Sequence, residues 1–224
     1  MAKEVLTPEE QMLHEAHVQT ESFFEKHSKM VVVAIVVIFA LATAIFGYKK
    51  LVSEPRMNKA QEMLYQAQYR FEQQNADFAL ALNGDEIAPG FAEVAEQYGN
   101  TPAGNLANLY AAACSLRLGD FDAAQKYLNN YSDVDGIPGE IVNAMAAGIK
   151  GEIAVEKNEY EAAAKLFEQA AKLSENSFTT PMYLRKAAVV YKELGQTEKA
   201  KELYQIIKDS YSDSYDAREA EKNI

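Results

Sequence analysis

The heptapeptide LGDFDAA at residues 118–124 decides the fold, because the same design recurs twice further along the chain. It returns as KNEYEAA at residues 157–163 and as LGQTEKA at residues 194–200. The second residue of each copy recurs at intervals of 39 and 37 residues, at Gly119, Asn158 and Gly195. Self-similarity at such a period is the signature of a repeat array.

Each copy has the composition of a turn between two helices. Glycine or asparagine adopts the left-handed backbone conformation that ends a helix. In the first copy, Ala124 then lets two helices approach closely, and Leu128 fills the space one turn later. In the second copy, one helix face collects Tyr160, Ala163, Phe167 and Ala170. The pattern predicts an all-α chain built from about three to four helical hairpins, clearest over residues 105–212.

The charge and the residue inventory exclude several classes of function. With 22 basic and 33 acidic residues the formal charge is −11, which argues against nucleic-acid binding. The single cysteine, Cys114, excludes an intramolecular disulfide and a multi-cysteine zinc site. All three histidines precede residue 28, so the rest of the chain has no histidine-dependent triad or metal site. We therefore expect no catalytic residue, no metal and no cofactor.

An uncharged stretch of 18 residues, Met30–Gly47, predicts a membrane anchor over residues 30–48. As a helix it is about 27 Å long, close to the roughly 30 Å of a hydrocarbon core. A buried core helix would seldom be apolar on every face, and the preceding leader is too long and too acidic for a signal peptide. Lysines flank both sides of the stretch, so their count leaves the orientation open.

Three further parts are expected around the anchor. The leader, residues 1–29, begins a helix at about residue 8, where Thr7 and Pro8 form a helix start. Residues 49–55 are expected to be a linker after the span. The repeat domain covers residues 56–224, with a degenerate first unit that includes a helix from residue 56 to 74.

The repeats resemble the tetratricopeptide repeat. Its small and large core positions are matched by Ala112, Gly119, Ala124, Leu128 and Tyr131, by Gly151, Asn158, Ala163, Phe167 and Ala170, and by Ala188, Gly195, Ala200, Tyr204 and Ile207. The family's tryptophan is absent, and both intervals exceed the usual 34 residues. The resemblance implies an α-solenoid with a concave groove lined by the first helix of each pair.

The same resemblance designates the residues that would bind a partner. The candidate groove residues are Leu106, Leu109, Leu116, Arg117, Met145, Glu152, Val155, Met182, Arg185 and Val189. The Asn and Lys set that clamps a chaperone's C-terminal carboxylate is missing, so that kind of docking is not expected. The groove could hold an apolar peptide, a partner helix or the chain's own C-terminal helix, Ser214 to Asn223. Alternatively, many of these residues are simply packed.

Small residues in the span suggest a helix-packing face. Ala40 and Ala44, and likewise Thr43 and Gly47, have the spacing that allows close helix–helix approach in a membrane. A lipid-facing position is the alternative for all four.

The layout as a whole is similar to the YfgM family of ancillary subunits of the bacterial SecYEG translocon. Four features carry the likeness: an acidic leader, the run Phe23-Phe24-Glu25-Lys26 before a single span, degenerate repeats and the final residues Asn223-Ile224. The resemblance implies an inner-membrane protein with a cytoplasmic N-terminus and a periplasmic repeat domain. It further implies association with SecYEG, with a membrane-anchored PpiD-like chaperone and with secreted polypeptides.

The sequence thus leads to a non-enzymatic scaffold or chaperone at the translocon. Two other readings stay open. One is a scaffold for assembling another envelope complex. The other is a membrane-tethered adaptor whose repeats face the cytoplasm.

Overall fold

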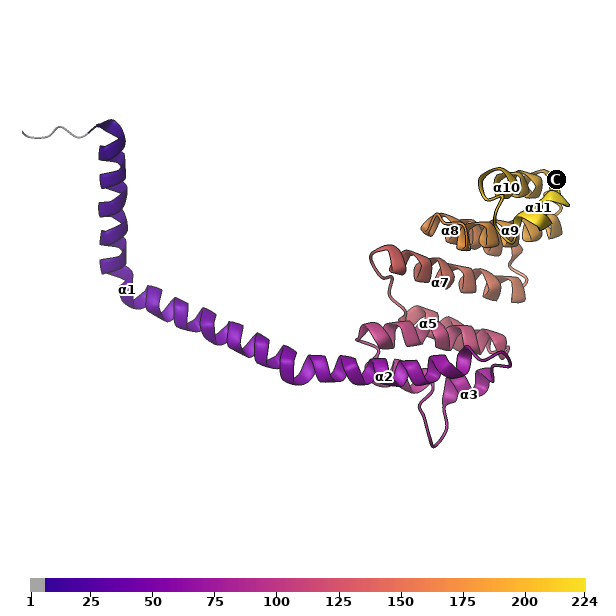
Figure 1. The fold of residues 1–224 in the computed structure, drawn as a ribbon, viewed down its shortest axis with the longest axis horizontal. Coiled ribbons are helices and arrows are strands. Elements are labelled where there is room, and N and C mark those ends of the chain that lie inside the picture. Colours follow the sequence, from indigo (N-terminus) through magenta and orange to yellow (C-terminus); the bar gives the residue numbers. More distant parts are fainter. Residues whose placement is uncertain (1–6) are drawn as a thin grey trace, which may run out of the picture. The chain divides into compact units, whose positions relative to one another are not determined.

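The computed structural model describes residues 7–224, which divide between Pro55 and Arg56 into two compact units. Along the chain the helices are α1 (Pro8–Tyr48), α2 (Glu54–Phe71), α3 (Phe78–Asn83), α4 (Phe91–Tyr98), α5 (Pro102–Arg117), α6 (Phe121–Asn130), α7 (Ile137–Glu156), α8 (Tyr160–Leu173), α9 (Thr179–Glu193), α10 (Thr197–Ser210) and α11 (Ala217–Glu221) (Figure 1). The expected all-α architecture, a long apolar helix followed by helical repeats, is confirmed.

The leader and the predicted anchor form one helix, α1, because no residue between Pro8 and Tyr48 breaks the helical pattern. Among the described residues, the helical stretch His27–Phe71 is long and apolar enough to cross a membrane. None of its most apolar window is buried among the described residues. An apolar surface of this length is suited to lipid.

Residues 49–55, where a linker is expected, are helical. Lys49–Ser53 form a π-helical turn, and α2 begins directly after it at Glu54. The reason is Pro55, whose ring would clash with the carbonyl group four residues earlier in a regular α-helix. The N–H of Glu54 donates instead to the carbonyl oxygen of Lys49, five residues back, which widens the helix just before the proline.

Three helical hairpins follow the predicted design: α5–α6, α7–α8 and α9–α10. Each turn residue has a positive φ, 78° at Gly119, 61° at Asn158 and 72° at Gly195. The residue after each turn residue donates its backbone N–H to the carbonyl oxygen five residues earlier. In the first hairpin, this hydrogen bond joins Asp120 N to Ser115 O over 2.9 Å. This hydrogen bond closes the helix end in the way that a left-handed turn residue permits.

A degenerate first unit precedes the hairpins. Helix α2 buries Ala60, Leu64 and Ala67 on one face, as the spacing predicted, and Leu64 and Ala67 share a buried cluster with residues of α4. The stretch between them holds the short helix α3 and a loop joined by an isolated β-bridge between Gly84 and Pro89.

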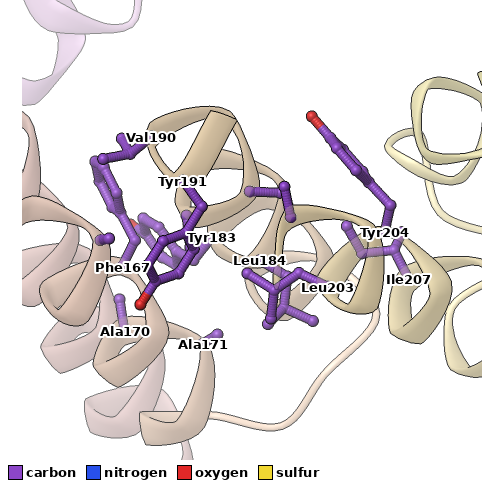
Figure 2. Packing of buried hydrophobic residues seen from close by; sticks show 14 of the residues in the cluster. Phe167, Ala170, Ala171, Tyr183, Leu184, Val190, Tyr191, Leu203, Tyr204 and Ile207 are labelled. Carbon is purple, nitrogen blue, oxygen red and sulfur yellow. The ribbon is translucent and has the colours of Figure 1, made fainter. Parts of the chain in front are cut away.

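The core runs along the array as small residues facing large ones. Ala163 and Ala170 are fully buried beside Phe167, and Phe167 stacks on Tyr183 of the next hairpin with ring centroids 6.4 Å apart (Figure 2). A Cβ on Gly151 would lie 2.7 Å from the Phe167 ring, so only glycine allows this approach of α7 to α8. The C-terminal helix α11 is shorter than the expected Ser214–Asn223, because a turn occupies Tyr211–Asp216.

Candidate functional site

The first helices of the three hairpins, α5, α7 and α9, line an open pocket of about 470 Å³. Its lining comprises Leu116, Arg117, Glu152, Val155, Glu156, Phe167, Arg185, Lys186, Val189 and Val190. Six of the ten predicted groove residues are therefore brought together here: Leu116, Arg117, Glu152, Val155, Arg185 and Val189.

The pocket combines an apolar floor with a charged rim. Phe167 and Val190 are almost fully buried at its base, whereas Val189 remains 44% exposed. One ion pair joins two rim residues, Lys186 and Glu152, and a second joins the rim residue Arg185 to Asp216, which lies outside the pocket lining. The Lys186 ammonium also lies 5.7 Å from the centroid of the Phe167 ring, within cation–π distance.

Two charged groups on the rim have no hydrogen bond or ion pair within the part of the chain that the structure describes. Arg117 ends α5 and Glu156 ends α7, and both side chains are exposed. Arg117 can therefore bind a carboxylate of a ligand, and Glu156 can bind a cationic group of a ligand.

The other four predicted groove residues lie elsewhere. Leu106 lines a second depression of about 390 Å³ between α2 and α5, together with Met57 and Pro102. Met182 is half-buried against the core and Met145 is 40% exposed, and neither lines the pocket. Leu109 is only 3% exposed, so its assignment to an open groove is wrong: it packs in the cluster that joins α5 to α7.

The sequence did not point to Lys186, Phe167 or Val190 as pocket residues. The repeat pattern predicts Phe167 as a core residue, and it is one, but its ring also lines the base of the pocket. The pairing of Lys186 with Glu152 spans 34 residues and two repeats. No local pattern signals such a contact, because the helix-to-helix register that creates it is a property of the packed array.

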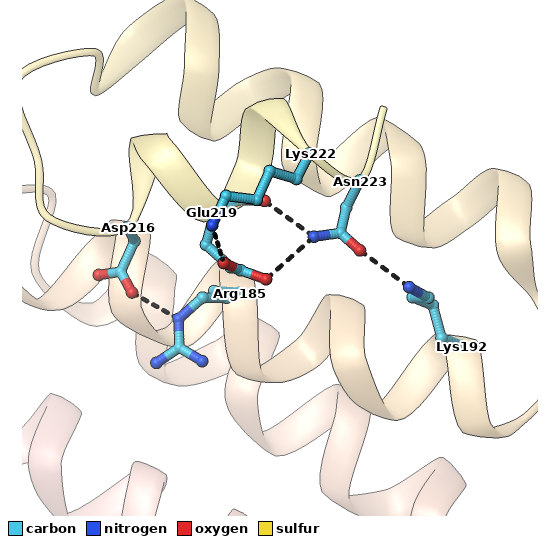
Figure 3. A network of polar contacts seen from close by, with 6 residues as sticks. All are labelled: Arg185, Lys192, Asp216, Glu219, Lys222 and Asn223. Atoms are coloured by element: carbon cyan, nitrogen blue, oxygen red, sulfur yellow. Dashed lines mark hydrogen bonds and ion pairs between the residues drawn. The ribbon is translucent and has the colours of Figure 1, made fainter.

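The C-terminal segment lies on α9 beside the pocket and leaves the pocket open. Besides the Arg185–Asp216 pair, Lys192 donates a 2.8 Å hydrogen bond to the Asn223 side chain, and Asn223 donates to the carbonyl oxygen of Glu219 (Figure 3). Residues of α11 are absent from the pocket lining. The idea that the chain's own C-terminal helix fills the groove is therefore not supported.

Comparison with known proteins decides the family. The family described as a tetratricopeptide repeat-like domain matches residues 21–205, which is most of the chain. This protein belongs to the tetratricopeptide repeat-like domain family. The match begins before the apolar stretch, so it covers the candidate anchor as well as the repeats. Searches of curated proteins and of solved structures each returned no match.

Membership in the tetratricopeptide repeat-like family indicates a protein–protein interaction scaffold, of a kind that is typically non-catalytic. The one cysteine fits that role. Cys114 is fully buried, and burial raises the pKa of its thiol to about 12. A thiol that stays protonated at neutral pH is a poor nucleophile.

The four small residues of the span, Ala40, Thr43, Ala44 and Gly47, lie in α1. Ala40, Thr43 and Ala44 are exposed, and a Cβ on Gly47 would meet no atom within 4 Å. This surface has room for another helix, and the role of the four residues stays a prediction.

Proposed function

We propose that this protein is a membrane-anchored repeat scaffold at the SecYEG translocon, where its pocket binds a partner chaperone or an emerging secreted polypeptide. The coarser part of this statement, a repeat scaffold with a protein partner, follows from the family. The translocon, the PpiD-like chaperone and the periplasmic location rest on the likeness in layout to the YfgM family.

The pocket between α5, α7 and α9 is the observation that carries the proposal. A volume of about 470 Å³ accommodates one or two side chains of a peptide. Leu116, Val155 and Val189 offer apolar contacts, while Arg117 and Glu156 offer charges that pair with no side chain among the described residues. An apolar anchor with a few polar groups around it is the usual arrangement of a peptide-binding hot spot.

Site-specific crosslinking in native membranes tests the partner. A photoreactive benzoylphenylalanine replaces Val189 in the pocket. In the matched control, benzoylphenylalanine replaces Glu202, an exposed residue of α10, the second helix of the last hairpin. We expect adducts with translocon subunits, the chaperone or secreted chains from position 189 alone. Adducts with subunits of another envelope complex would contradict the proposal and favour the assembly scaffold.

Thiol labelling of intact cells tests the location. Ser210 and Asn130 are exposed, so Ser210→Cys and Asn130→Cys in a Cys114→Ala background give accessible thiols. A membrane-impermeant maleimide should label both without lysis if the repeats are periplasmic. Labelling only after lysis would place the repeats in the cytoplasm, and the tethered adaptor would then replace the translocon scaffold as the preferred function.

A further inference from the structure

The three connections that follow the second helix of each hairpin each hold one apolar side chain in solvent. Val134 in the α6–α7 connection is 42% exposed, Phe178 before α9 is 74% exposed, and Tyr215 before α11 is 85% exposed. Because consecutive helices of a solenoid alternate in direction, these three connections share one edge of the array. Figure 1 shows the α6–α7 connection and the α7–α8 turn at opposite ends of α7.

Side-chain hydrogen bonds hold the first two connections in place. The backbone N–H of Val134 donates to Asn143 Oδ1 over 3.0 Å, and Asn143 Nδ2 donates back to the Val134 carbonyl oxygen over 3.0 Å. In the second connection, the N–H of Phe178 donates to Asn176 Oδ1 over 2.8 Å. Both apolar side chains thus stand on a pre-organised backbone, which lowers the entropy cost of binding a partner.

The third connection is tied to the array through its neighbour. Asp216, next to Tyr215, is buried and paired with Arg185 of α9. The Tyr215 ring carries one basic neighbour, Arg218, at 6.0 Å from the ring centroid. Tyrosine on a held backbone is among the residues that most often dominate binding energy.

Acidic residues accompany each of the three apolar side chains. Asp133 and Asp135 flank Val134, Glu175 precedes Phe178, and Asp213 precedes Tyr215. All four carboxylates are exposed, and none forms an ion pair with another described residue. Their charge favours a cationic partner and opposes a second copy of this chain, whose formal charge is −11, as well as an anionic lipid surface.

We propose that Val134, Phe178 and Tyr215, with their acidic neighbours, form a docking surface for a basic polypeptide segment that carries apolar side chains. We call it the inter-repeat edge. It is separate from the pocket on the first helices, so this inference stands whether or not the translocon function is correct.

A fluorescence experiment on the full chain in nanodiscs of zwitterionic lipid tests the inter-repeat edge. The chain has no tryptophan, so Phe178→Trp introduces a single reporter, and Leu118→Trp at the opposite end of the hairpins is its matched control. The probe is a twelve-residue peptide of alternating lysine and leucine, and its counterpart has glutamate for lysine. We expect the lysine peptide to shift the emission of the Phe178→Trp reporter to the blue, with no shift for the glutamate peptide or for the control reporter.

Affinity measurements complete the test. The triple variant Val134→Ser/Phe178→Ser/Tyr215→Ser should bind a fluorescein-labelled lysine peptide about tenfold more weakly, which corresponds to about 1.4 kcal/mol. Raising salt to about 0.5 M should also weaken binding, because exposed charges are then screened. The pocket variant Val189→Glu should bind the peptide as the unaltered chain does.

Four results would overturn the inter-repeat edge as a docking surface. The first is equal binding of the lysine and glutamate peptides, and the second is unchanged affinity for the lysine peptide in the triple variant. The third is loss of peptide binding in the Val189→Glu variant. The fourth is a blue-shifted emission of the Phe178→Trp reporter before any peptide is added. The third would assign the peptide to the pocket. The fourth would show that the loop contacts lipid or a second copy, and sedimentation of the nanodiscs distinguishes those two occupants.

Discussion

Arg185 of α9 pairs with Asp216, the residue directly before α11, so that a side chain of the pocket rim also fastens the C-terminal segment. The Asp216 side chain is 9% exposed and that of Arg185 is 32% exposed. A solenoid needs a cap over its last repeat, because the outer face of that repeat has no further neighbour. The ion pair provides one of the links that hold this cap.

Asp216→Asn should therefore destabilise the last hairpin. We expect a loss of about 1–2 kcal/mol in the free energy of unfolding, since a nearly buried carboxylate is lost while Arg185 keeps some access to water. Urea unfolding of the full chain in detergent, followed by circular dichroism, measures this. Asp213→Asn, at an exposed residue of the same connection, is the control and should be silent. Equal effects of the two variants would refute the role of the pair.

Gly148→Ala should disturb the contact between α7 and α9. A Cβ at this position would lie 2.2 Å from Cε1 of Tyr183, so the ring must move. Overpacking of this kind costs about 1–3 kcal/mol, more than the gain in helix propensity. Gly47→Ala, where a Cβ meets nothing, should not destabilise. In a double-mutant cycle, Tyr183→Ala should remove most of the cost of Gly148→Ala, and additive effects would contradict the proposed clash.

Leu109→Ala and Leu116→Ala should separate packing from binding. Leu109 is 3% exposed in the cluster between α5 and α7, so its truncation should lower the free energy of unfolding by about 2–4 kcal/mol. Leu116 lines the pocket and is only partly buried, so its truncation should cost less stability and weaken crosslinking from the pocket. Similar losses of stability in both variants would mean that Leu116 is a core residue.

Glu168 should make the protein sensitive to acid. Burial acts to raise the pKa of Glu168, but hydrogen bonds from Tyr191 and Lys199 and the charges of Lys199 and Lys172 outweigh it and hold the pKa below the ordinary value of 4.5. A carboxyl group whose pKa is lower in the folded state stabilises the protein above its unfolded pKa, and this contribution disappears as the pH falls through the folded pKa.

The test compares the unaltered chain with Glu168→Gln. The variant should have a lower Tm at neutral pH, and its Tm should fall less between neutral pH and about pH 3. Asp85 and Glu219 also have lowered pKa values, through hydrogen bonds from Arg70 and Lys222 respectively, but they are present in both proteins and cancel in the comparison. Parallel Tm curves would exclude a contribution of Glu168.

Features that depend on neighbouring residues in the chain were predictable. Gly119, Asn158 and Gly195 were identified as helix-ending turn residues, and all three have the expected positive φ. The apolar faces around Ala163 and Phe167 were also assigned correctly. Each of these follows from local backbone sterics and a 3.6-residue period, which a short window of sequence contains in full.

The amino-acid sequence by itself thus determined the helical repeats, their turns and an apolar helix long enough to span a membrane. Only the tertiary structure decided that Leu109 is packed while Leu116 is open, that Lys186 joins Glu152 across two repeats, and that α11 lies beside the pocket rather than in it. The physical reason is that these features depend on the register of one hairpin against the next. That register results from the fit of many side chains distant in the chain, such as Tyr183 against Phe167 and Gly148, and no local periodicity encodes it.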